Sequence, residues 1–523
     1  MYQHMRAIFG LPGLWLVYLF LIASLGPLQV YSVNLNRIMI GTTVSGILIL
    51  FAILVSLRML LAVLFRRPSV TDPLIALLGI CGFYNNFFVG GDSGLRFWIW
   101  VLFFLLLVLL VFFSPRLRVL LPRNLCIFLG VLNGLVVFNI LQHDVWTGRA
   151  ALRAALDNDY PPLSTVGPDG PSGRPDIYFI VFDRYARADQ LAARYDFDNS
   201  GFLESLRERG FQVSGRSYSA YQRTAHSLAS TLNLDYVPSI EGRASNDWVP
   251  LYERLRAPRL YPFLKAAGYR IVTMGSWWEP TRTSPLADQN IAYFAVPESL
   301  RPMVEHSMIL RGLGRMGIAW LNPRNRQCAR IKHKFGALED AASAEEPVFV
   351  FAHFLVPHPP FVIDADGACK TAGQARSASR RDNYIAQLEY TNSAILKLIH
   401  TLMDKNPDSV IILQSDEGPW PNKYAGEEIT HFGADVTSVD WNIVAPDDLR
   451  EKMAILNAIY LPGKPNISIK DDFSPVNTFR LILREYFDQP LQDLQTENRV
   501  FLSNSLLWQF RDVHGDLTEG EPR

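Results

Sequence analysis

The first 150 residues contain very few acidic side chains and no lysine. Asp72, Asp92 and Asp144 are the acids of this region, against ten arginines. Residues 151–523 hold 40 of the 50 basic and 47 of the 50 acidic side chains, and the formal net charge of the whole chain is +0. Without a large positive excess, a nucleic-acid binder with a basic face is excluded. Four cysteines in 523 residues, with 49% hydrophobic residues, also exclude a small disulfide scaffold and a disordered chain.

The N-terminal part of the chain contains five long apolar runs. A helix needs about 20 apolar residues to cross the hydrocarbon core of a membrane. Buried core helices of a soluble protein are an alternative, and a cleaved signal peptide ending near Ala23–Gly26 is an alternative for the first run. Five runs with so few acids favour a transmembrane domain of five helices over residues 1–141. The runs are Leu11–Val33, Gly41–Phe65, Pro73–Val89, Phe97–Phe113 and Val119–Leu141.

The arginines predict how these spans are oriented in the membrane. Loops on the cytoplasmic side carry an excess of arginine and lysine. With the N-terminus in the cytoplasm, Arg37 and Arg96 fall outside, and five spans place everything after residue 142 outside the cytoplasm. We therefore predict a multi-pass protein of the cell membrane with an extracytoplasmic C-terminal domain. The arginines that then face the cytoplasm are Arg6, Arg66, Arg67, Arg116, Arg118 and Arg123.

The rest of the chain divides into a linker and an α/β domain. Prolines and glycines between Pro161 and Pro175 predict a linker over residues 142–174. From residue 175 to 523, apolar strands alternate with helices, which indicates a mostly parallel sheet with helices on both faces. The strands are expected at Ile177–Phe182, Arg270–Met274, Val348–Phe354, Val410–Leu413 and Met453–Tyr460, and helices at Ser200–Arg209, Thr224–Leu234, Leu251–Ala267, Asp382–Met403 and Val476–Tyr486.

Two of the four cysteines, Cys328 and Cys369, lie in the predicted external domain. An oxidising compartment outside the cytoplasm permits a disulfide between them. The sequence gives no Cα separation, so a bonded pair and two free thiols both remain open.

Polar side chains gather where three of the predicted strands end. Asp183 follows the first strand, while Asp416 and Glu417 follow a late one, and His353 and His358 lie at the end of a strand between them. Open α/β sheets place their chemistry at the carboxyl ends of strands. Three carboxylates at one sheet edge repel each other unless a cation neutralises them. The pattern therefore predicts a divalent metal.

The order of these residues resembles the alkaline phosphatase superfamily in its sulfatase-like branch. The chain has a strand ending in Asp183, Thr224 at a helix start, His353-x4-His358-Pro-Pro, and Ser-Asp416-Glu417-Gly. Five spans followed by such a domain are similar to lipoteichoic acid synthase and phosphoethanolamine transferases. The resemblance implies one divalent cation held by Asp183, Thr224 and Asp416, with the fourth ligand position falling on Glu417.

Glu417 departs from the family pattern, which usually has Ser-Asp-His-Gly. A carboxylate in place of an imidazole shifts the expected metal from Zn²⁺ towards Mn²⁺, Mg²⁺ or Ca²⁺. The same departure leaves open a degenerate copy whose external domain binds a glycan or a partner without catalysis.

Thr224 is the nucleophile that the resemblance implies. Sulfatases carry cysteine or serine in a Cys/Ser-x-Pro-x-Arg signature, and neither Cys328 nor Cys369 stands in such a signature. Thr224 begins a predicted helix, where backbone N–H groups favour an anion, and a metal would ease loss of its proton. A plain N-cap threonine is the alternative role for Thr224, and Ser227 is the alternative nucleophile.

Four further residues are candidates for contact with the substrate. His358 and His353 could bind a phosphate oxygen or protonate a leaving alkoxide, and His353 could equally be a packed core histidine. His431 lies at about the position of a substrate histidine in phosphoethanolamine transferases. Arg184 could touch an anionic head group, although a solvated surface arginine is its alternative reading.

These observations predict a membrane-anchored, metal-dependent phosphotransferase or hydrolase. Thr224 would take a phosphorylated head group from a phospholipid donor and pass it to a glycan or lipid acceptor, or to water. A sulfatase or phosphodiesterase type of ester hydrolase is the enzymatic alternative, and no nucleic-acid partner is expected.

Overall fold

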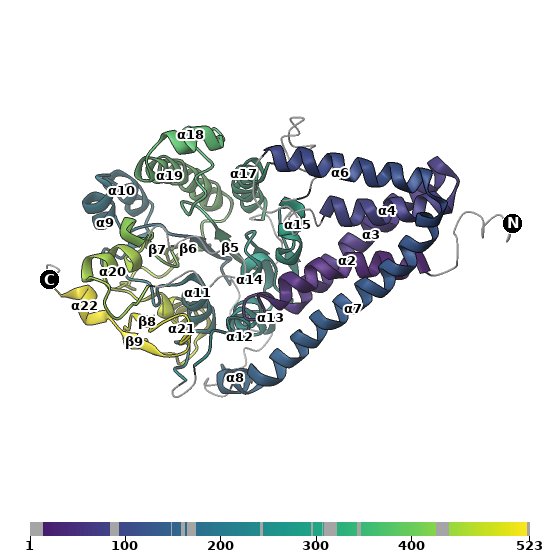
Figure 1. Ribbon diagram of the computed structural model, residues 1–523. Coiled ribbons are helices and arrows are strands. Elements are labelled where there is room, and N and C mark those ends of the chain that lie inside the picture. The colour runs from purple at the N-terminus through teal and green to yellow at the C-terminus, as the bar shows by residue number, and fades with distance from the viewer. Residues whose placement is uncertain are drawn as a thin grey trace. The chain divides into compact units, whose positions relative to one another are not determined.

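The computed structural model divides the chain into two compact units (Figure 1). One unit comprises residues 1–148 and 296–322, and the other comprises residues 149–295 and 323–523. The structure describes residues 14–83, 94–147, 149–157, 163–164, 174–240, 244–293, 296–305, 307, 322–341, 347–424 and 439–519.

The first unit is a bundle in which α2 contacts α3, α4 and α7 (Figure 1). Apolar side chains on all sides of these helices suit a membrane rather than water. Among the described residues, three helices are long and apolar enough to cross a membrane, over Trp15–Ser32, Ile40–Phe65 and Asn124–His143. Two others carry shorter apolar segments, Ser69–Gly82 and Val101–Phe113, so the count of five spans stays a prediction. The helices are α2 (Leu14–Ser32), α3 (Ile40–Phe65), α4 (Pro68–Phe83), α6 (Gly94–Phe113) and α7 (Pro115–Thr147).

A segment from the C-terminal half of the sequence belongs to this first unit. The short helices η1 (Glu298–Leu300) and α15 (Arg301–Glu305) follow β4 in the chain, and the Ser299 hydroxyl donates a hydrogen bond to the Thr42 carbonyl on α3 (3.2 Å). A Cβ on Gly46 would lie 2.7 Å from Ser299 Oγ. Glycine at position 46 therefore allows this segment to lie directly against α3.

The predicted linker is helical at its start. Helix α7 continues to Thr147, and α8 (Arg149–Asp157) follows it. The sequence between Gln142 and Asp157 contains no proline, so both segments can be helical. Most of the prolines and glycines that predicted the linker lie at 158–162 and 165–173, outside the described residues.

The second unit is built on a seven-stranded sheet of order β2-β7-β6-β1-β5-β3-β4. Five adjacent strands from β6 to β4 run parallel, and β7 is antiparallel to β6 and β2. The prediction of a mostly parallel sheet is confirmed. The strands are β1 (Ile177–Phe182), β2 (Gln212–Val213), β3 (Arg270–Met274), β4 (Gln289–Asn290), β5 (Val348–Phe354), β6 (Val410–Gln414) and β7 (Asn457–Tyr460), with a separate pair β8 (Arg499–Phe501) and β9 (Phe510–Asp512).

Helices cover both faces of the sheet, as its fully buried central strands β1, β5 and β6 require. On one face, side chains of α17 and α19 form a core with the even-numbered residues of β1 and β5. On the other face, Phe479 of α21 packs on Phe179 and Phe349, with ring centroids 5.1 Å and 5.7 Å apart. The helices are α9 (Ala188–Tyr195), α10 (Ser200–Glu208), α11 (Thr224–Asn233), α12 (Val249–Arg256), α13 (Leu260–Ala266), α14 (Glu279–Arg282), α17 (Pro323–Ala341), α18 (Ala372–Ser377), α19 (Arg380–Lys405), α20 (Pro446–Met453), α21 (Thr478–Phe487) with η4 (Pro475–Asn477) before it, and α22 (His514–Thr518).

Two predicted elements have different bounds in the structure. The helix expected over Leu251–Ala267 is split into α12 and α13, because Pro258 disfavours a helical conformation at the residue before it. The strand expected from Met453 begins at Asn457, since Met453 ends α20.

Of the two possibilities that the sequence left open for Cys328 and Cys369, the structure has the disulfide, with Cα atoms 5.8 Å apart. It joins α17 to the loop that follows β5.

Candidate functional site

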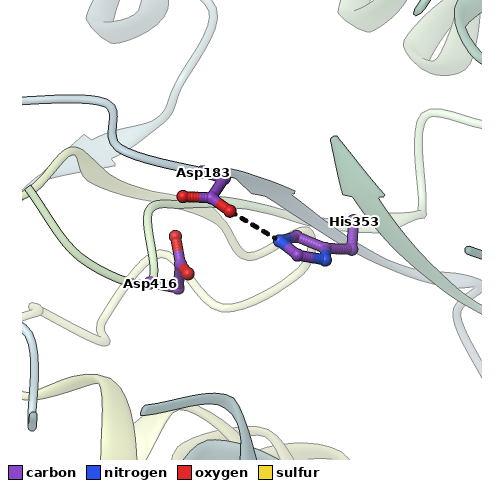
Figure 2. A group of neighbouring side chains, drawn as sticks. All are labelled: Asp183, His353 and Asp416. Atoms are coloured by element: carbon purple, nitrogen blue, oxygen red, sulfur yellow. Dashed lines mark ion pairs between the residues drawn. The ribbon is translucent and has the colours of Figure 1, made fainter. Parts of the chain in front are cut away.

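The register of three parallel strands brings Asp183, His353 and Asp416 together (Figure 2). Val181 of β1 lies level with His353 on one side and with Gln414 on the other. Asp183 and Asp416 each follow two residues later, and alternate residues of a strand share a face. The three side chains therefore meet on one face at the carboxyl end of the sheet, with one ligand atom from each within 4.8 Å of the others.

This group has the properties of a metal site. Asp183 Oδ1, both carboxylate oxygens of Asp416 and His353 Nε2 are buried and make no hydrogen bond to a described residue. His353 Nε2 lies 3.5 Å from Asp183 Oδ2 (Figure 2). Arg184 Nε lies 3.9 Å from Asp183 Oδ1, beyond hydrogen-bond distance. Buried carboxylates without hydrogen bonds are costly unless a cation neutralises them. The residues present therefore fit a divalent cation.

His353 is oriented by groups behind it, as a metal-binding histidine usually is. Its Nδ1 lies 2.9 Å from the Thr281 hydroxyl, which lies 2.9 Å from the Ser276 hydroxyl. Lys334 Nζ donates a hydrogen bond to the His353 carbonyl. These contacts leave Nε2 facing Asp183. The expected preference for Mn²⁺, Mg²⁺ or Ca²⁺ rested on the replacement of an imidazole by the carboxylate of Glu417. His353 supplies an imidazole to the group, and the identity of the metal stays a prediction.

Burial changes the protonation of all three residues. It raises the pKa of Asp183 to about 7, against the effect of Arg184. It also raises the pKa of Asp416 to about 7, where Asp183 and Glu417 add to the shift and His353 and the Thr224 side chain oppose it. Burial lowers the pKa of His353 to about 4, so this imidazole is neutral and able to bind a cation near neutral pH.

These pKa shifts predict a pH-dependent effect of metal on thermal stability. Without metal, the folded chain keeps protons on Asp183 and Asp416 that the unfolded chain loses near pH 4, so stability should fall as pH rises from about 4 to about 7. Metal binding displaces those protons. We expect Mn²⁺ to raise the melting temperature of the purified full-length chain more at about pH 8 than at about pH 5.5. An equal increase at both pH values would contradict this assignment.

Thr224 is the first residue of α11, and the N-cap position belongs to Arg223. The alternative reading of Thr224 as the N-cap residue is therefore wrong. The side chain of Thr224 is partly exposed and lowers the pKa of Asp416, which places it beside the metal-site group. Its role as a nucleophile and metal ligand stays a prediction.

Ser227, the alternative nucleophile, is buried one turn further along α11. Its hydroxyl donates a hydrogen bond to the Tyr221 carbonyl (2.9 Å). This contact gives Ser227 a structural role within the fold and does not favour it as the nucleophile.

Glu417 lies next to the group but has other partners. Its Oε1 lies 2.7 Å from Lys452 Nζ and accepts a hydrogen bond from Arg184 Nε (3.1 Å). Its Oε2 accepts the Thr224 N–H (3.1 Å). Burial raises the pKa of Glu417, but Lys452 and Arg184 outweigh it and lower that pKa overall. Glu417 therefore places a carboxylate at the start of α11, where backbone N–H groups favour an anion.

Arg184 is 6% exposed, so its reading as a solvated surface arginine is wrong. It follows Asp183 with a positive φ of 66°, a conformation that costs a non-glycine residue about 1–2 kcal/mol. The Tyr384 hydroxyl donates to the Arg184 carbonyl (2.8 Å) and helps to hold this turn. The turn carries both the Asp183 and the Arg184 side chains into the site.

His358 is partly buried in the loop after β5. Its Nδ1 contacts the Pro359 carbonyl, which can only accept, so Nδ1 carries the proton and Nε2 is an acceptor. Burial, followed by Arg184 and Lys452, lowers the pKa of His358 well below its usual range. A neutral His358 suits a proton acceptor. The two roles expected for His358, binding a phosphate oxygen or protonating a leaving alkoxide, stay predictions. His431 lies outside the described residues, and its role stays a prediction.

Solved structures similar to this chain include two bacterial proteins. The C-terminal periplasmic domain of EptC from Escherichia coli is 12% identical, with a TM-score of 0.43 over 70% of this chain and 99% of that chain. Lipooligosaccharide phosphoethanolamine transferase A from Neisseria meningitidis, an integral membrane protein, is 13% identical, with a TM-score of 0.41 over 95% of this chain and 98% of that chain. These similarities concern the fold alone. Among curated proteins, none matches the chain.

Residues 175–437 match the family model described as Sulfatase. The match begins just before β1 and includes Asp183, His353 and Asp416, the residues that meet at the candidate metal site, as well as Thr224. The chain therefore belongs to the sulfatase family, and its α/β unit is a sulfatase-like hydrolase or transferase.

Proposed function

We propose that the chain is a membrane-anchored phosphotransferase that uses Thr224 to take a phosphorylated head group from a phospholipid. The observation that carries this proposal is the position of a partly exposed threonine hydroxyl beside Asp416, in the buried group of Asp183, His353 and Asp416. Thr224 occupies the nucleophile position of a family whose sulfate-hydrolysing members use a cysteine or serine in a different signature.

The reaction would proceed in two displacements. In the first, Thr224 Oγ gives up its proton and attacks the phosphorus, the bond to the diacylglycerol oxygen breaks, and that oxygen takes up a proton from solvent, which gives free diacylglycerol and a phosphothreonine diester. In the second, an acceptor hydroxyl or water attacks the same phosphorus and the bond to Thr224 Oγ breaks. His358, neutral and with Nε2 free of its proton, suits the role of base towards the acceptor hydroxyl.

A divalent cation, when bound, would ease loss of the Thr224 proton and neutralise charge on the phosphoryl oxygens. Asp183, His353 and Asp416 would hold it. Arg184, whose side chain reaches the same site, would bind a phosphoryl oxygen of the head group.

The membrane unit would keep this chemistry close to its lipid donor. With the N-terminus in the cytoplasm, more of the arginines in the apolar part of the sequence face the cytoplasm than the outside. This distribution supports a cell-membrane protein with its N-terminus in the cytoplasm and its α/β unit outside, acting on an outer-leaflet phospholipid and a glycan or lipid acceptor.

A direct assay separates this proposal from sulfate ester hydrolysis. Purified full-length chain loaded with Mn²⁺ is mixed with vesicles of fluorescent phosphatidylglycerol or phosphatidylethanolamine, and in parallel with an aryl sulfate. We expect fluorescent diacylglycerol from at least one phospholipid and no sulfate release, because Thr224 cannot become a formylglycine. Sulfate release without lipid turnover would favour the sulfatase alternative, and neither activity would favour the non-catalytic one.

A further inference from the structure

Glu417 occupies the position at which the resemblance implies a metal ligand, yet its contacts differ from those of its neighbour. Asp416 is buried without a hydrogen bond to a described residue. Glu417 is 2% exposed, and both of its carboxylate oxygens already accept donors. It is not among the described residues whose ligand atoms converge on one point. Two adjacent carboxylates therefore stand in opposite situations.

The partners of Glu417 neutralise its charge without a metal. Lys452 Nζ, 0% exposed, lies 2.7 Å from Oε1, and Arg184 Nε lies 3.1 Å from the same oxygen. Two cations beside one buried carboxylate leave no excess negative charge there for a metal to offset. They also repel a further cation from that oxygen, since unit charges a few ångströms apart interact strongly in a buried site.

The backbone fixes Lys452 against the loop that carries Glu417. The Gly418 N–H donates to the Lys452 carbonyl (2.7 Å), and Lys452 Nζ donates to the Gly418 carbonyl (3.2 Å). A Cβ on Gly418 would lie 2.3 Å from the Glu451 carbonyl oxygen. The close approach that glycine permits therefore holds the ion pair of Glu417 and Lys452 in one geometry.

The same carboxylate holds the start of α11. Its Oε2 accepts the backbone N–H of Thr224 (3.1 Å), one of the donors that the first turn of a helix leaves without a partner in the helix. A fixed anion at this position also stabilises the positive end of the helix dipole. One carboxylate oxygen of Glu417 thus contacts Lys452 and Arg184, and its other oxygen accepts the backbone N–H of Thr224, the proposed nucleophile.

We infer that Glu417 is not a metal ligand in this chain and instead, paired with Lys452, positions Thr224 for attack. The effect on turnover rests on the proposed function, whereas the assignment of the metal ligands does not. The ligands are then Asp183, His353 and Asp416, together with Thr224, and the imidazole of His353 takes the place of the one that position 417 lacks.

The experiment compares the full-length wild type with Glu417→Gln and with the double variant Glu417→Gln/Lys452→Met. The double variant removes both charges of the pair, so it leaves no lysine ammonium without its counter-charge. Lys370→Met is the matched control, because Lys370 is a buried lysine paired with Asp364 (3.2 Å) outside the site. Bound Mn²⁺ per chain, a melting curve, and the kcat and KM of diacylglycerol release are measured for each.

We expect Glu417→Gln and the double variant to bind as much Mn²⁺ as the wild type. Their kcat should fall about 10- to 100-fold with little change in KM, because a displacement of a reacting group by about 1 Å costs about 100-fold in rate. Lys370→Met should change neither the bound Mn²⁺ per chain nor kcat.

Loss of Mn²⁺ from a folded Glu417→Gln chain would return Glu417 to the metal site and overturn the inference. An unchanged kcat in the folded double variant would overturn the positioning role. If the wild type releases no diacylglycerol, the proposed function fails, and the metal content of the variants still decides the place of Glu417.

Discussion

Replacing Thr224 by alanine is expected to lower the rate of diacylglycerol release by at least about a thousandfold, because loss of a nucleophile commonly costs several orders of magnitude. The fold should remain nearly intact. Thr224 is partly exposed and is not the N-cap residue of α11, and such positions typically contribute about 1 kcal/mol or less to stability. The two effects differ enough in size to be separated by an activity assay and a melting curve.

Two variants on the same helix control for structural damage. Thr231→Ala removes a buried hydroxyl that donates to the Ser227 carbonyl (3.0 Å), and it should cost about 1 kcal/mol of stability without stopping turnover. Thr224→Ser should retain part of the activity, because its hydroxyl can still attack. Full turnover by a folded Thr224→Ala chain would remove Thr224 from the mechanism. The same conclusion would follow if turnover were lost in Ser227→Ala but not in Thr224→Ala.

Replacing Asp416 by asparagine is expected to abolish metal binding, from one Mn²⁺ per chain to a small fraction of that. The change removes one of two buried carboxylates that face each other across the site and keeps the shape of the side chain. Because burial, Asp183 and Glu417 all raise the pKa of Asp416, to about 7, removing its charge should also stabilise the metal-free chain at about pH 8. We therefore expect Asp416→Asn to melt at a higher temperature than metal-free wild type and to gain nothing from added Mn²⁺.

Asp364→Asn is the matched control for this variant, since Asp364 is paired with Lys370 away from the site. It should bind Mn²⁺ as the wild type does. If a folded Asp416→Asn chain still binds one Mn²⁺, the metal binds at another place and the assigned site is wrong.

The sequence predicted the parts of the site that lie at the ends of parallel strands. Asp183, His353 and Asp416 each follow or end an apolar run, and parallel strands bring their carboxyl ends to one edge. What the sequence could not show is the register, which places His353 level with Val181 and so makes an imidazole part of the group. Register depends on packing across the whole sheet rather than on any single strand.

The position of Lys452 beside the site could not be predicted from the sequence either. Lys452 precedes β7, which is antiparallel to β6, so the beginning of β7 lies at the same edge as the ends of the parallel strands. A search for polar residues after strands therefore passes over it. Thr281, which lies 2.9 Å from His353, is likewise carried on α14, a helix too short to leave a periodic signal.

The segment that carries η1 and α15 had no signal in the sequence at all. It lies between β4 and α17 in the chain but belongs to the first unit. Leu300 and Met303 are buried among the apolar residues of that unit, and two scattered apolar residues do not distinguish such a segment from an ordinary loop.

The central claim is that a lipid head group passes through Thr224. Its most direct test is peptide mass spectrometry of the full-length chain, quenched in acid after incubation with phospholipid vesicles and Mn²⁺ in the absence of an acceptor. We expect the peptide that contains Thr224 to gain the mass of the phosphorylated head group, and fragmentation to place that mass on Thr224. An adduct on another residue, or lipid turnover with Thr224 unmodified at every time point, would contradict the mechanism.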